Sequence, residues 1–422
     1  MTGSADPRAS GSARRPTLGL SAVAILAIGL VLVAVVTTGT RPGIAAVPST
    51  SAGEISPGTS AAGPTSSAEA SEAPGATPAA TPAPAPQLVP APLTGLLVTP
   101  AAARQHPIAV MIDDHQGARP QSGFNAASIV WQAPAEGGIP RYMLIFQDTI
   151  PGLVGPVRSS RQYYIEWASE WHAMYVHAGG SPQALATLAA HGGGGWVWNA
   201  DAFRWEGIYL WRVHQVKVLG GPFYPLVPPH NLYTDGSHLR ALATKLKVPD
   251  GPLTPVWTFA ADAPREDRPV GARLTVVYPY ESITYRYDAA TNTYRRYIDG
   301  SKRPQVDAAD GRVVAPKNVV ILRMAFGPLN DGHPNKMRLE ASDVGHGTAW
   351  ISTNGITVKG TWRKASTTAP TLLFGPNGKP VTFTAGQTFI EVVQLTYGVT
   401  IHDGVLPSVL PPPLNPDGLT PS

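Results

Sequence analysis

The chain of 422 residues contains no cysteine. Disulfide bonds, thiolate metal sites, a cysteine nucleophile and a lipid anchor on cysteine are therefore all excluded. The lack of disulfides remains compatible with export, because a domain large enough to form a hydrophobic core does not require them. Cysteine usage thus limits the chemistry of the protein without fixing its compartment.

Charged and aromatic residues are scarce in the N-terminal part. Charged residues make up 14% of the chain, against about a quarter in a typical soluble domain. The first aromatic residue is Phe124, and the charged residues between positions 42 and 94 are Glu54, Glu69 and Glu72. Such a segment cannot bury enough apolar surface to offset its chain entropy. We predict a disordered stalk rich in Ala, Pro, Ser and Thr over 38–94, and a folded part that begins near Gly95.

One apolar run precedes the stalk. The sequence LGLSAVAILAIGLVLVAVV (18–36) has no charged residue and approaches the length of about 20 residues that spans a bilayer as a helix. Arg8, Arg14 and Arg15 lie before it and favour a cytoplasmic N-terminus. We predict a cytoplasmic tail over 1–17, a transmembrane helix over 18–37 that enters the lipid bilayer, and an extracytoplasmic remainder. The alternative is a cleaved signal peptide, whose apolar core is usually shorter, about 7–15 residues.

The overall charge and the missing motifs exclude several function classes. The formal net charge is +4, which is too small for the dense basic patch of a nucleic-acid-binding protein, so no nucleic-acid partner is expected. No nucleophile elbow, phosphate-binding Walker loop, HExxH motif or dinucleotide fingerprint is present. The sequence therefore identifies neither a reaction nor a cofactor, and it leaves the choice between enzyme and binding protein open.

Two segments of different pattern follow the stalk. In residues 95–248, short apolar runs at 107–112, 127–133, 141–147 and 173–178 indicate strands, and 160–171 and 181–192 indicate helices. In the second helix, Ser181 suits the N-cap, Pro182 the first turn and Gly192 the end. Strands that alternate with helices indicate an α/β-like layer.

Residues 249–408 contain mainly strand patterns. Turn residues at 288–293 and 374–380 separate runs of alternating polarity, which is typical of antiparallel β structure. The predicted strands cover 272–279, 282–288, 293–300, 318–324, 347–353, 356–362, 380–386 and 388–395. The fold class is thus α+β, with an α/β-like N-terminal layer followed by a mainly antiparallel β part, and residues 409–422 are a disordered tail.

Several long motifs resemble a known family. HPIAVMIDDHQGARPQSGFNAASIVWQAPAEGGIPRYMLIFQ (106–147), GPVRSSRQYY (155–164), YVHAGGSPQAL (175–185), PPHNLYT (228–234) and two C-terminal stretches (318–324 and 347–364) are similar to the YerB-like bacterial envelope proteins. The resemblance covers roughly 95–405 and implies a two-part domain of unassigned activity outside the cytoplasm. Many members are lipid-anchored, so the predicted helix would replace the lipid here. The family has no established catalytic residues to carry over.

A strand-to-helix junction at 177–182 is the first candidate site. Gly179 and Gly180 permit a tight turn, and the free N–H groups at the helix start near Ser181 favour an anion. His177 at the strand end would face the same crevice. The alternative is an ordinary capped turn with a packed histidine.

A second candidate is Asp113-Asp114-His115, with Arg119 close behind, at the end of the first strand. Carboxylate and imidazole groups can hold a divalent metal or transfer a proton. Adjacent residues of a strand point to opposite faces, so only some of these side chains can converge. The alternative is a hydrogen-bonded Asx turn.

Three further groups of residues are candidates. Glu136, with Arg141 nearby, could serve as acid, base or metal ligand, while Arg158 and Arg161 could grip a phosphate or carboxylate. Surface ion pairs explain these residues equally well. His230 and Asn231 follow two prolines. A group of aromatic residues forms either a gripping loop or a lid over the core: Trp196, Trp198, Phe203, Trp205, Tyr209 and Trp211.

Two hypotheses follow. The first is a binding or regulatory module that grips a cell-wall polymer or a membrane-bound wall enzyme. The second is an envelope hydrolase or transferase acting on glycan or on a lipid-linked phosphate. Its catalytic candidates are Asp113, Asp114, His115, Glu136, His177 and His230, and the sequence leaves its need for a metal undetermined. Convergence of these side chains within about 10 Å would favour the enzyme.

Overall fold

The computed structural model describes residues 87–149 and 151–406, all of which belong to one compact unit. The predicted cytoplasmic tail, the transmembrane helix, residues 409–422 and most of the predicted stalk lie outside the described residues. Within the described ranges, no helix is both long and apolar enough to cross a membrane.

The ordered chain begins slightly before Gly95. Strand β1 (Val89–Pro90) pairs with β2 (Leu97–Val98), and the turn between them buries Leu93 and Thr94. Helix α1 (Pro100–Ala103) follows, with Thr99 as its N-cap. The last residues of the predicted stalk therefore belong to the folded part, because an apolar side chain at position 93 adds to its core.

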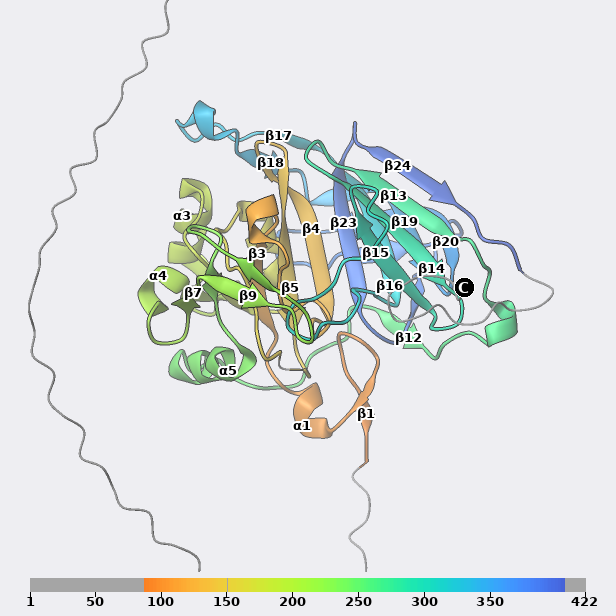
Figure 1. Cartoon of the computed structure of the whole chain (residues 1–422), viewed down its shortest axis with the longest axis horizontal. Coiled ribbons are helices and arrows are strands. Elements are labelled where there is room, and N and C mark those ends of the chain that lie inside the picture. Colours follow the sequence, from red (N-terminus) through yellow and green to blue (C-terminus); the bar gives the residue numbers. More distant parts are fainter. Residues whose placement is uncertain (1–86, 150, 407–422) are drawn as a thin grey trace, which may run out of the picture. The chain divides into compact units, whose positions relative to one another are not determined.

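A ten-stranded sheet forms the centre of the unit (Figure 1). The strand order is β21-β20-β19-β16-β23-β4-β5-β3-β6-β7, with both parallel and antiparallel pairs. Strand β23 pairs in parallel with β16 on one side and with β4 on the other. The bounds are β3 (Ile108–Asp113), β4 (Ile129–Glu136), β5 (Ile139–Phe146), β6 (Met174–His177), β7 (Trp198–Asp201), β16 (Asn318–Met324), β19 (Gly345–Thr353), β20 (Ile356–Lys364), β21 (Leu372–Phe374) and β23 (Thr388–Gln394).

Both faces of the central sheet are buried, because its strands alternate between two hydrophobic clusters. On β3, Val110 and Ile112 join one cluster, whereas Ala109 and Met111 join the other. The first cluster also contains side chains of an antiparallel four-stranded sheet with the order β15-β14-β13-β24. Its strands are β13 (Arg273–Val277), β14 (Ser282–Asp288), β15 (Thr293–Ile298) and β24 (Gly398–His402).

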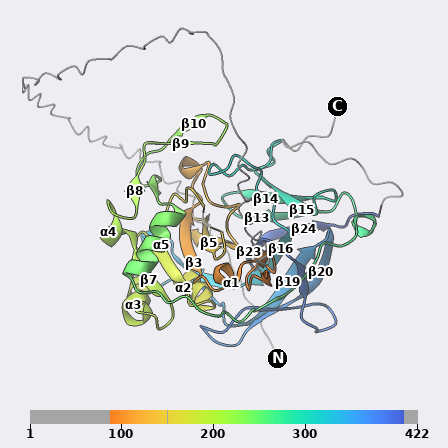
Figure 2. The same ribbon diagram turned by 90° about the horizontal axis from the view of Figure 1, so that it is seen from below.

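Helices flank the part of the sheet that contains β3, β6 and β7. Helix α2 (Gln162–Ser169) packs on the second cluster, where Trp167 stacks on Trp131 with ring centroids 4.6 Å apart. Helices α3 (Pro182–His191), α4 (Ala202–Trp205) and α5 (Gly236–Lys245) gather at the same end of the sheet, away from β13–β15 and β24 (Figures 1 and 2).

Short elements complete the described part. The two-stranded pairs are β8 (Trp211–Arg212) with β11 (Leu232–Tyr233), β9 (Gln215–Lys217) with β10 (Phe223–Pro225), β12 (Thr258–Ala260) with β22 (Thr382–Thr384), and β17 (Phe326–Pro328) with β18 (Leu339–Ala341). Three 3₁₀ turns cover Gln116–Ala118, Arg265–Asp267 and Pro334–Lys336.

Most elements expected from the sequence are confirmed. Each predicted strand of the C-terminal half is present, and Ser181 caps α3 through a hydrogen bond from the Ala184 N–H at 3.3 Å. The fold is mostly β with few and short helices. The two parts do not form separate layers, because β23 joins strands of both halves into one mixed sheet.

Candidate functional site

Three parallel strands end at the same edge of the central sheet. Asp113, His177 and Asp201 are the last residues of β3, β6 and β7, and these strands run in the same direction. The segment before α2 continues this edge, because the Arg158 N–H donates to the Met111 carbonyl at 2.9 Å and the Ser160 N–H donates to the Gly179 carbonyl at 2.8 Å. The edge therefore brings together candidates that are far apart in the sequence.

Asp113 binds two cationic or imidazole groups at this edge. Its Oδ2 accepts a hydrogen bond from His230 Nδ1 at 2.6 Å and lies 3.0 Å from Arg158 Nε, although the latter contact is an ion pair without good hydrogen-bond alignment. The Asp113 side chain is only 4% exposed. Burial alone would raise the pKa of Asp113, but the His230 hydrogen bond and the Arg158 charge outweigh it and lower the pKa.

His115 stacks on His230 and forms what we call the imidazole pair. The ring centroids are 4.4 Å apart and the planes differ by 11°. The Gly117 N–H donates to His115 Nδ1 at 3.0 Å, so the neutral His115 ring carries its proton on Nε2. His230 donates through Nδ1, so its neutral ring has a lone pair on Nε2. Burial, followed by the His230 charge, lowers the pKa of His115.

Asp114 points away from the imidazole pair, as the alternation of a strand requires. Its carboxyl group accepts hydrogen bonds from Arg119 Nη2 at 3.1 Å and from Gln132 Nε2 at 2.7 Å. Arg119 also pairs with Glu281. Burial and the Glu281 charge raise the pKa of Asp114. Asp114 and Arg119 therefore belong to an internal network rather than to the imidazole pair.

This internal network lies between the two sheets. Its centre is Arg296, which is fully buried and donates to Tyr285 Oη at 3.1 Å and to Tyr142 Oη at 2.9 Å. Sequence analysis missed both residues, because Arg296 looks like an ordinary polar residue of the alternating strand β15 and Glu281 like a loop residue directly before β14. Only the three-dimensional contacts, such as the one between Arg119 and Glu281, reveal their role.

Glu136, Arg141 and Arg161 form a closed ion triad next to the edge. The Glu136 carboxylate, 29% exposed, pairs with both guanidinium groups, which are almost fully buried. Arg141 also donates to the Ser159 carbonyl at 2.8 Å. Burial and the neighbouring Arg141 charge lower the pKa of Arg161 to about 10. The charges of these three residues are paired with one another. They therefore stabilise the structure next to the edge and are less available to bind a ligand.

The junction after β6 is also internally bonded. His177 is fully buried, with Nδ1 2.8 Å from the Gly179 carbonyl and Nε2 2.8 Å from Asn199 Oδ1. The Gly179 N–H donates to Asp201 Oδ1 at 3.3 Å, so a carboxylate of the protein occupies the position expected for an anion. His177 is therefore a packed residue and does not face an open crevice.

The remaining loop candidates have structural partners. Asn231 accepts from Arg212 Nη1 at 3.2 Å and donates to the Val213 carbonyl at 3.0 Å. Ser181 caps α3, and Gly180 forms a bridge to Ser160. In the aromatic segment, Trp205 is buried, whereas Phe203 is 63% exposed beside Gly179. The segment is thus part lid and part exposed surface.

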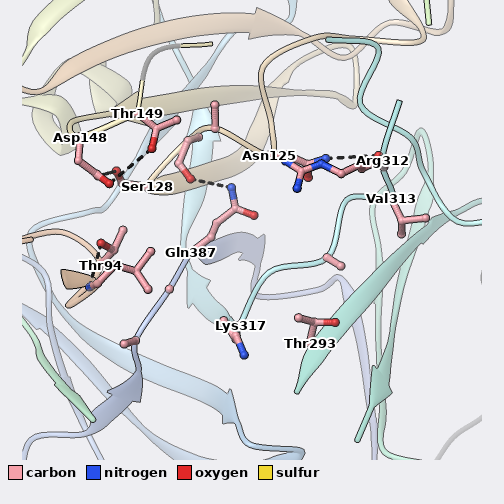
Figure 3. Close-up of a pocket in the computed structure, with 16 residues that line it drawn as sticks. Thr94, Asn125, Ser128, Asp148, Thr149, Thr293, Arg312, Val313, Lys317 and Gln387 are labelled. Atoms are coloured by element: carbon pink, nitrogen blue, oxygen red, sulfur yellow. Dashed lines mark hydrogen bonds between the residues drawn. The ribbon is translucent and has the colours of Figure 1, made fainter. Parts of the chain in front are cut away.

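No group of three or more His, Asp or Glu side chains within the described residues is arranged to hold a metal ion. A cavity of about 330 Å³ opens at the other end of the central sheet, near the starts of β4, β16 and β23 (Figure 3). Its polar side chains bind protein partners: Lys317 pairs with Asp262 at 2.8 Å, and Gln387 donates to the Ala127 carbonyl at 2.7 Å. None of the candidates from the sequence lines this cavity.

Comparison with known proteins agrees with the resemblance. The chain is 30% identical over 318 residues to YerB, a candidate lipoprotein of Bacillus subtilis (strain 168), covering 74% of this chain and 89% of that protein. It is also similar to the crystal structure of YerB from Bacillus subtilis, with a TM-score of 0.62 and 26% identity over 74% of this chain and 99% of that one. Residues 93–249 and 274–390 match the N-terminal and C-terminal domains of a protein of unknown function named DUF3048. The chain therefore belongs to the DUF3048 family and is a relative of YerB.

Proposed function

We propose that this chain is a membrane-anchored extracytoplasmic protein that binds a cell-envelope polymer at the imidazole pair. One observation carries the proposal: Arg158 and His230 converge with Asp113 and His115 on one edge of the sheet, although both lie far from these two residues in the sequence. Most other polar candidates bind one another inside the fold, so this edge is the best supported place for a ligand.

The location rests on two observations. The related YerB is a candidate lipoprotein, and the apolar run 18–36 could anchor this cysteine-free chain in the place of a lipid. A protease applied to intact cells should then remove the C-terminal part, as detected by an antibody against residues 274–390. A fully protected C-terminal part, with an exposed extracellular control protein, would reverse the proposed topology.

The chemistry of the edge suits hydroxyl and anionic groups. His115 Nε2–H can donate a hydrogen bond, His230 Nε2 can accept one, and the partly exposed Arg158 supplies a positive charge. A glycan that carries phosphate groups offers matching acceptors, donors and negative charge. The proposed ligand is therefore a polymer of the envelope, and the small net charge of +4 argues against a nucleic acid.

Co-sedimentation of the full chain in detergent with purified wall sacculi tests the binding, before and after acid removal of phosphate-linked polymers. We expect retention on intact sacculi and about tenfold weaker retention of His230→Gln, since hydrogen bonds to charged groups contribute about 1.5–3 kcal/mol. His402→Gln, at an exposed position of β24, is the matched control. Failure of the wild type to sediment with either preparation contradicts the proposal.

A second candidate function is an envelope hydrolase or transferase acting on glycan or lipid-linked phosphate. The hydrogen bond between Asp113 and His230 Nδ1 favours it, because a carboxylate that orients an imidazole leaves Nε2 as a general base. Incubation of the full chain with a purified envelope fraction would release soluble sugars or phosphate esters. Release that persists in Asp113→Asn and His230→Gln would exclude this site as the catalyst.

The polymer-binding edge could also regulate a membrane-bound envelope synthase. In that case chemical crosslinking in cells would capture a synthase with the wild type and lose it with His230→Gln. Retention of the protein on sacculi without any crosslinked synthase would favour the polymer alone.

A further inference from the structure

A second cavity, of about 510 Å³, lies between the β9–β10 hairpin and the loop after β15. The hairpin packs closely on this loop, which connects β15 to β16, because the Leu219 N–H donates to the Ala308 carbonyl at 3.1 Å. The volume falls in the usual range of small-molecule sites, about 300–1,000 Å³. The apolar walls are formed by Pro120, Val218, Leu219, Pro222, Ile298 and Pro304.

Gln305 lines this cavity and carries an unused donor. Its Oε1 accepts a hydrogen bond from Arg296, which fixes the orientation of the amide because an NH₂ group facing a guanidinium would be repelled. Nε2 is consequently the free end of the amide, and it is buried without an acceptor among the described residues. A buried donor without an acceptor is costly, so a ligand oxygen at this point would be favourable.

Arg119 presents a second unused donor. Its Nη2 binds Asp114 and Glu281, whereas its Nε is buried without an acceptor in the described part of the chain. Arg119 and Gln305 both line the cavity, and the exposed Arg303 lines it as well. Two residues that each carry an unsatisfied N–H group, together with the exposed Arg303 guanidinium, therefore line a space whose walls are otherwise largely apolar.

The cavity near the other end of the sheet provides a contrast. None of its lining residues has a buried polar side-chain atom that lacks a partner within the described ranges. Unused donors are thus a feature of the cavity beside Gln305 rather than of every cavity in the fold.

We propose that the cavity beside Gln305 binds a small organic anion, a carboxylate or a phosphate ester with an apolar body. The anionic oxygens accept from Gln305 Nε2, Arg119 Nε and the Arg303 guanidinium, and the apolar body packs on the proline-rich walls. This site is distinct from the imidazole pair and uses none of its side chains, so it adds a second ligand to the proposed function.

Nearby carboxylates do not cancel the positive charge. Glu281 and Asp299 lie next to Arg119, at hydrogen-bond distance and at 4.0 Å respectively. Asp114 also pairs with Arg119, and burial and the Glu281 charge raise the pKa of Asp114. The charged residues that line the cavity are Arg119 and Arg303, and no carboxylate of the described residues lines it.

Calorimetric titration of the full chain in detergent tests the proposal with three probes of similar size: benzoate, phenyl phosphate and the neutral benzyl alcohol. We expect at least one of the two anions to bind about tenfold more tightly than the alcohol, because hydrogen bonds to charged groups are the stronger ones. Preference for one anion distinguishes a carboxylate from a phosphate ligand. Equal or undetectable binding of all three probes overturns the proposal.

Two variants locate the binding. Gln305→Glu keeps the acceptor for Arg296, replaces the donor by an oxygen and should abolish anion binding. Arg303→Met changes an exposed residue, so it should fold normally and weaken the binding about tenfold. Lys302→Met, the exposed neighbour that does not line the cavity, is the control and should change the affinity less than about twofold. Unchanged anion binding in Arg303→Met, or an equal loss in Lys302→Met, overturns the proposal even if Gln305→Glu fails to fold.

Discussion

At the scale of single residues, a substitution of Asp113 tests the contacts that this residue makes with His230 and Arg158. We expect Asp113→Asn to lower the free energy of unfolding at pH 7 by about 1–3 kcal/mol, because His230 and Arg158 lose a buried charged partner. Urea denaturation of both proteins measures this difference.

The same substitution should alter the pH dependence. The pKa of Asp113 is lower in the native than in the unfolded chain, so its contribution is complete above about pH 4 and is lost as the pH falls through the native value. The difference between wild type and Asp113→Asn should shrink below pH 4. A difference that grows on acidification would contradict the assigned ion pair.

Asp343 has a raised pKa, so its effect on stability has the opposite pH dependence. Burial and the nearby Glu166 carboxylate raise the pKa of Asp343 to about 9. The native state therefore keeps a proton that the unfolded chain loses above about pH 4, and stability declines as the pH rises from 4 to 9. Asp343→Asn needs no proton, so we expect it to be more stable than the wild type by about 1–3 kcal/mol at pH 8 and similar at pH 4. Equal urea midpoints of the wild type and Asp343→Asn at both pH values would refute the raised pKa of Asp343.

The divergence of Asp113 and Asp114 follows from the sequence alone, because adjacent residues of a strand face opposite sides. The partners of Asp113 and of the Asp114 network cannot be predicted from the sequence. His230 is 117 positions from Asp113, and Glu281 is 162 positions from Arg119. A single sequence contains no signal for such long-range contacts, so the imidazole pair and the internal network could be identified only from the three-dimensional structure.

At the scale of elements, the β9–β10 hairpin depends on a glycine in the loop that it contacts. Gly311 has a φ of +71°, and a Cβ there would lie 2.1 Å from the Leu219 carbonyl oxygen. Gly311→Ala should therefore displace the hairpin and lower the stability by about 1–3 kcal/mol more than Gly300→Ala, which shares the positive φ but faces open space.

Hydrogen exchange of residues 215–225 should accelerate in Gly311→Ala and stay unchanged in Gly300→Ala. Equal exchange in both variants would mean that the loop adapts without moving the hairpin. Unlike the free energy of unfolding, exchange reports which element responds.

Local signals predicted the long elements well. Ser181, Pro182 and Gly192 defined α3, an alternating run defined β14, and a continuous apolar run defined β16. Short strands such as β12 and β17 were missed, since three residues contain too little periodicity to distinguish them from loops. The predicted antiparallel character of the C-terminal part holds for β13–β15 but not for β16 and β23, which pair in parallel.

At the scale of the whole molecule, the central sheet makes the two family domains interdependent. Strand β23 from the C-terminal half supplies the partner of β4 from the N-terminal half. A fragment of residues 87–255 would expose this edge of β4, and exposed apolar edges associate with other chains. We expect the fragment to aggregate, while the full chain unfolds in one transition by circular dichroism and tryptophan fluorescence. A soluble, cooperatively folding fragment would disprove the interdependence.

The order of the strands has one further consequence, for biogenesis. Synthesis runs from the N-terminus, so β4 emerges long before Thr388 and the rest of β23 exist. Throughout that interval the unpaired apolar edge of β4 is exposed and can associate with any neighbouring chain. Cells that make this protein would therefore benefit from a chaperone that covers this edge of β4 until β23 has been synthesised and can pair with it.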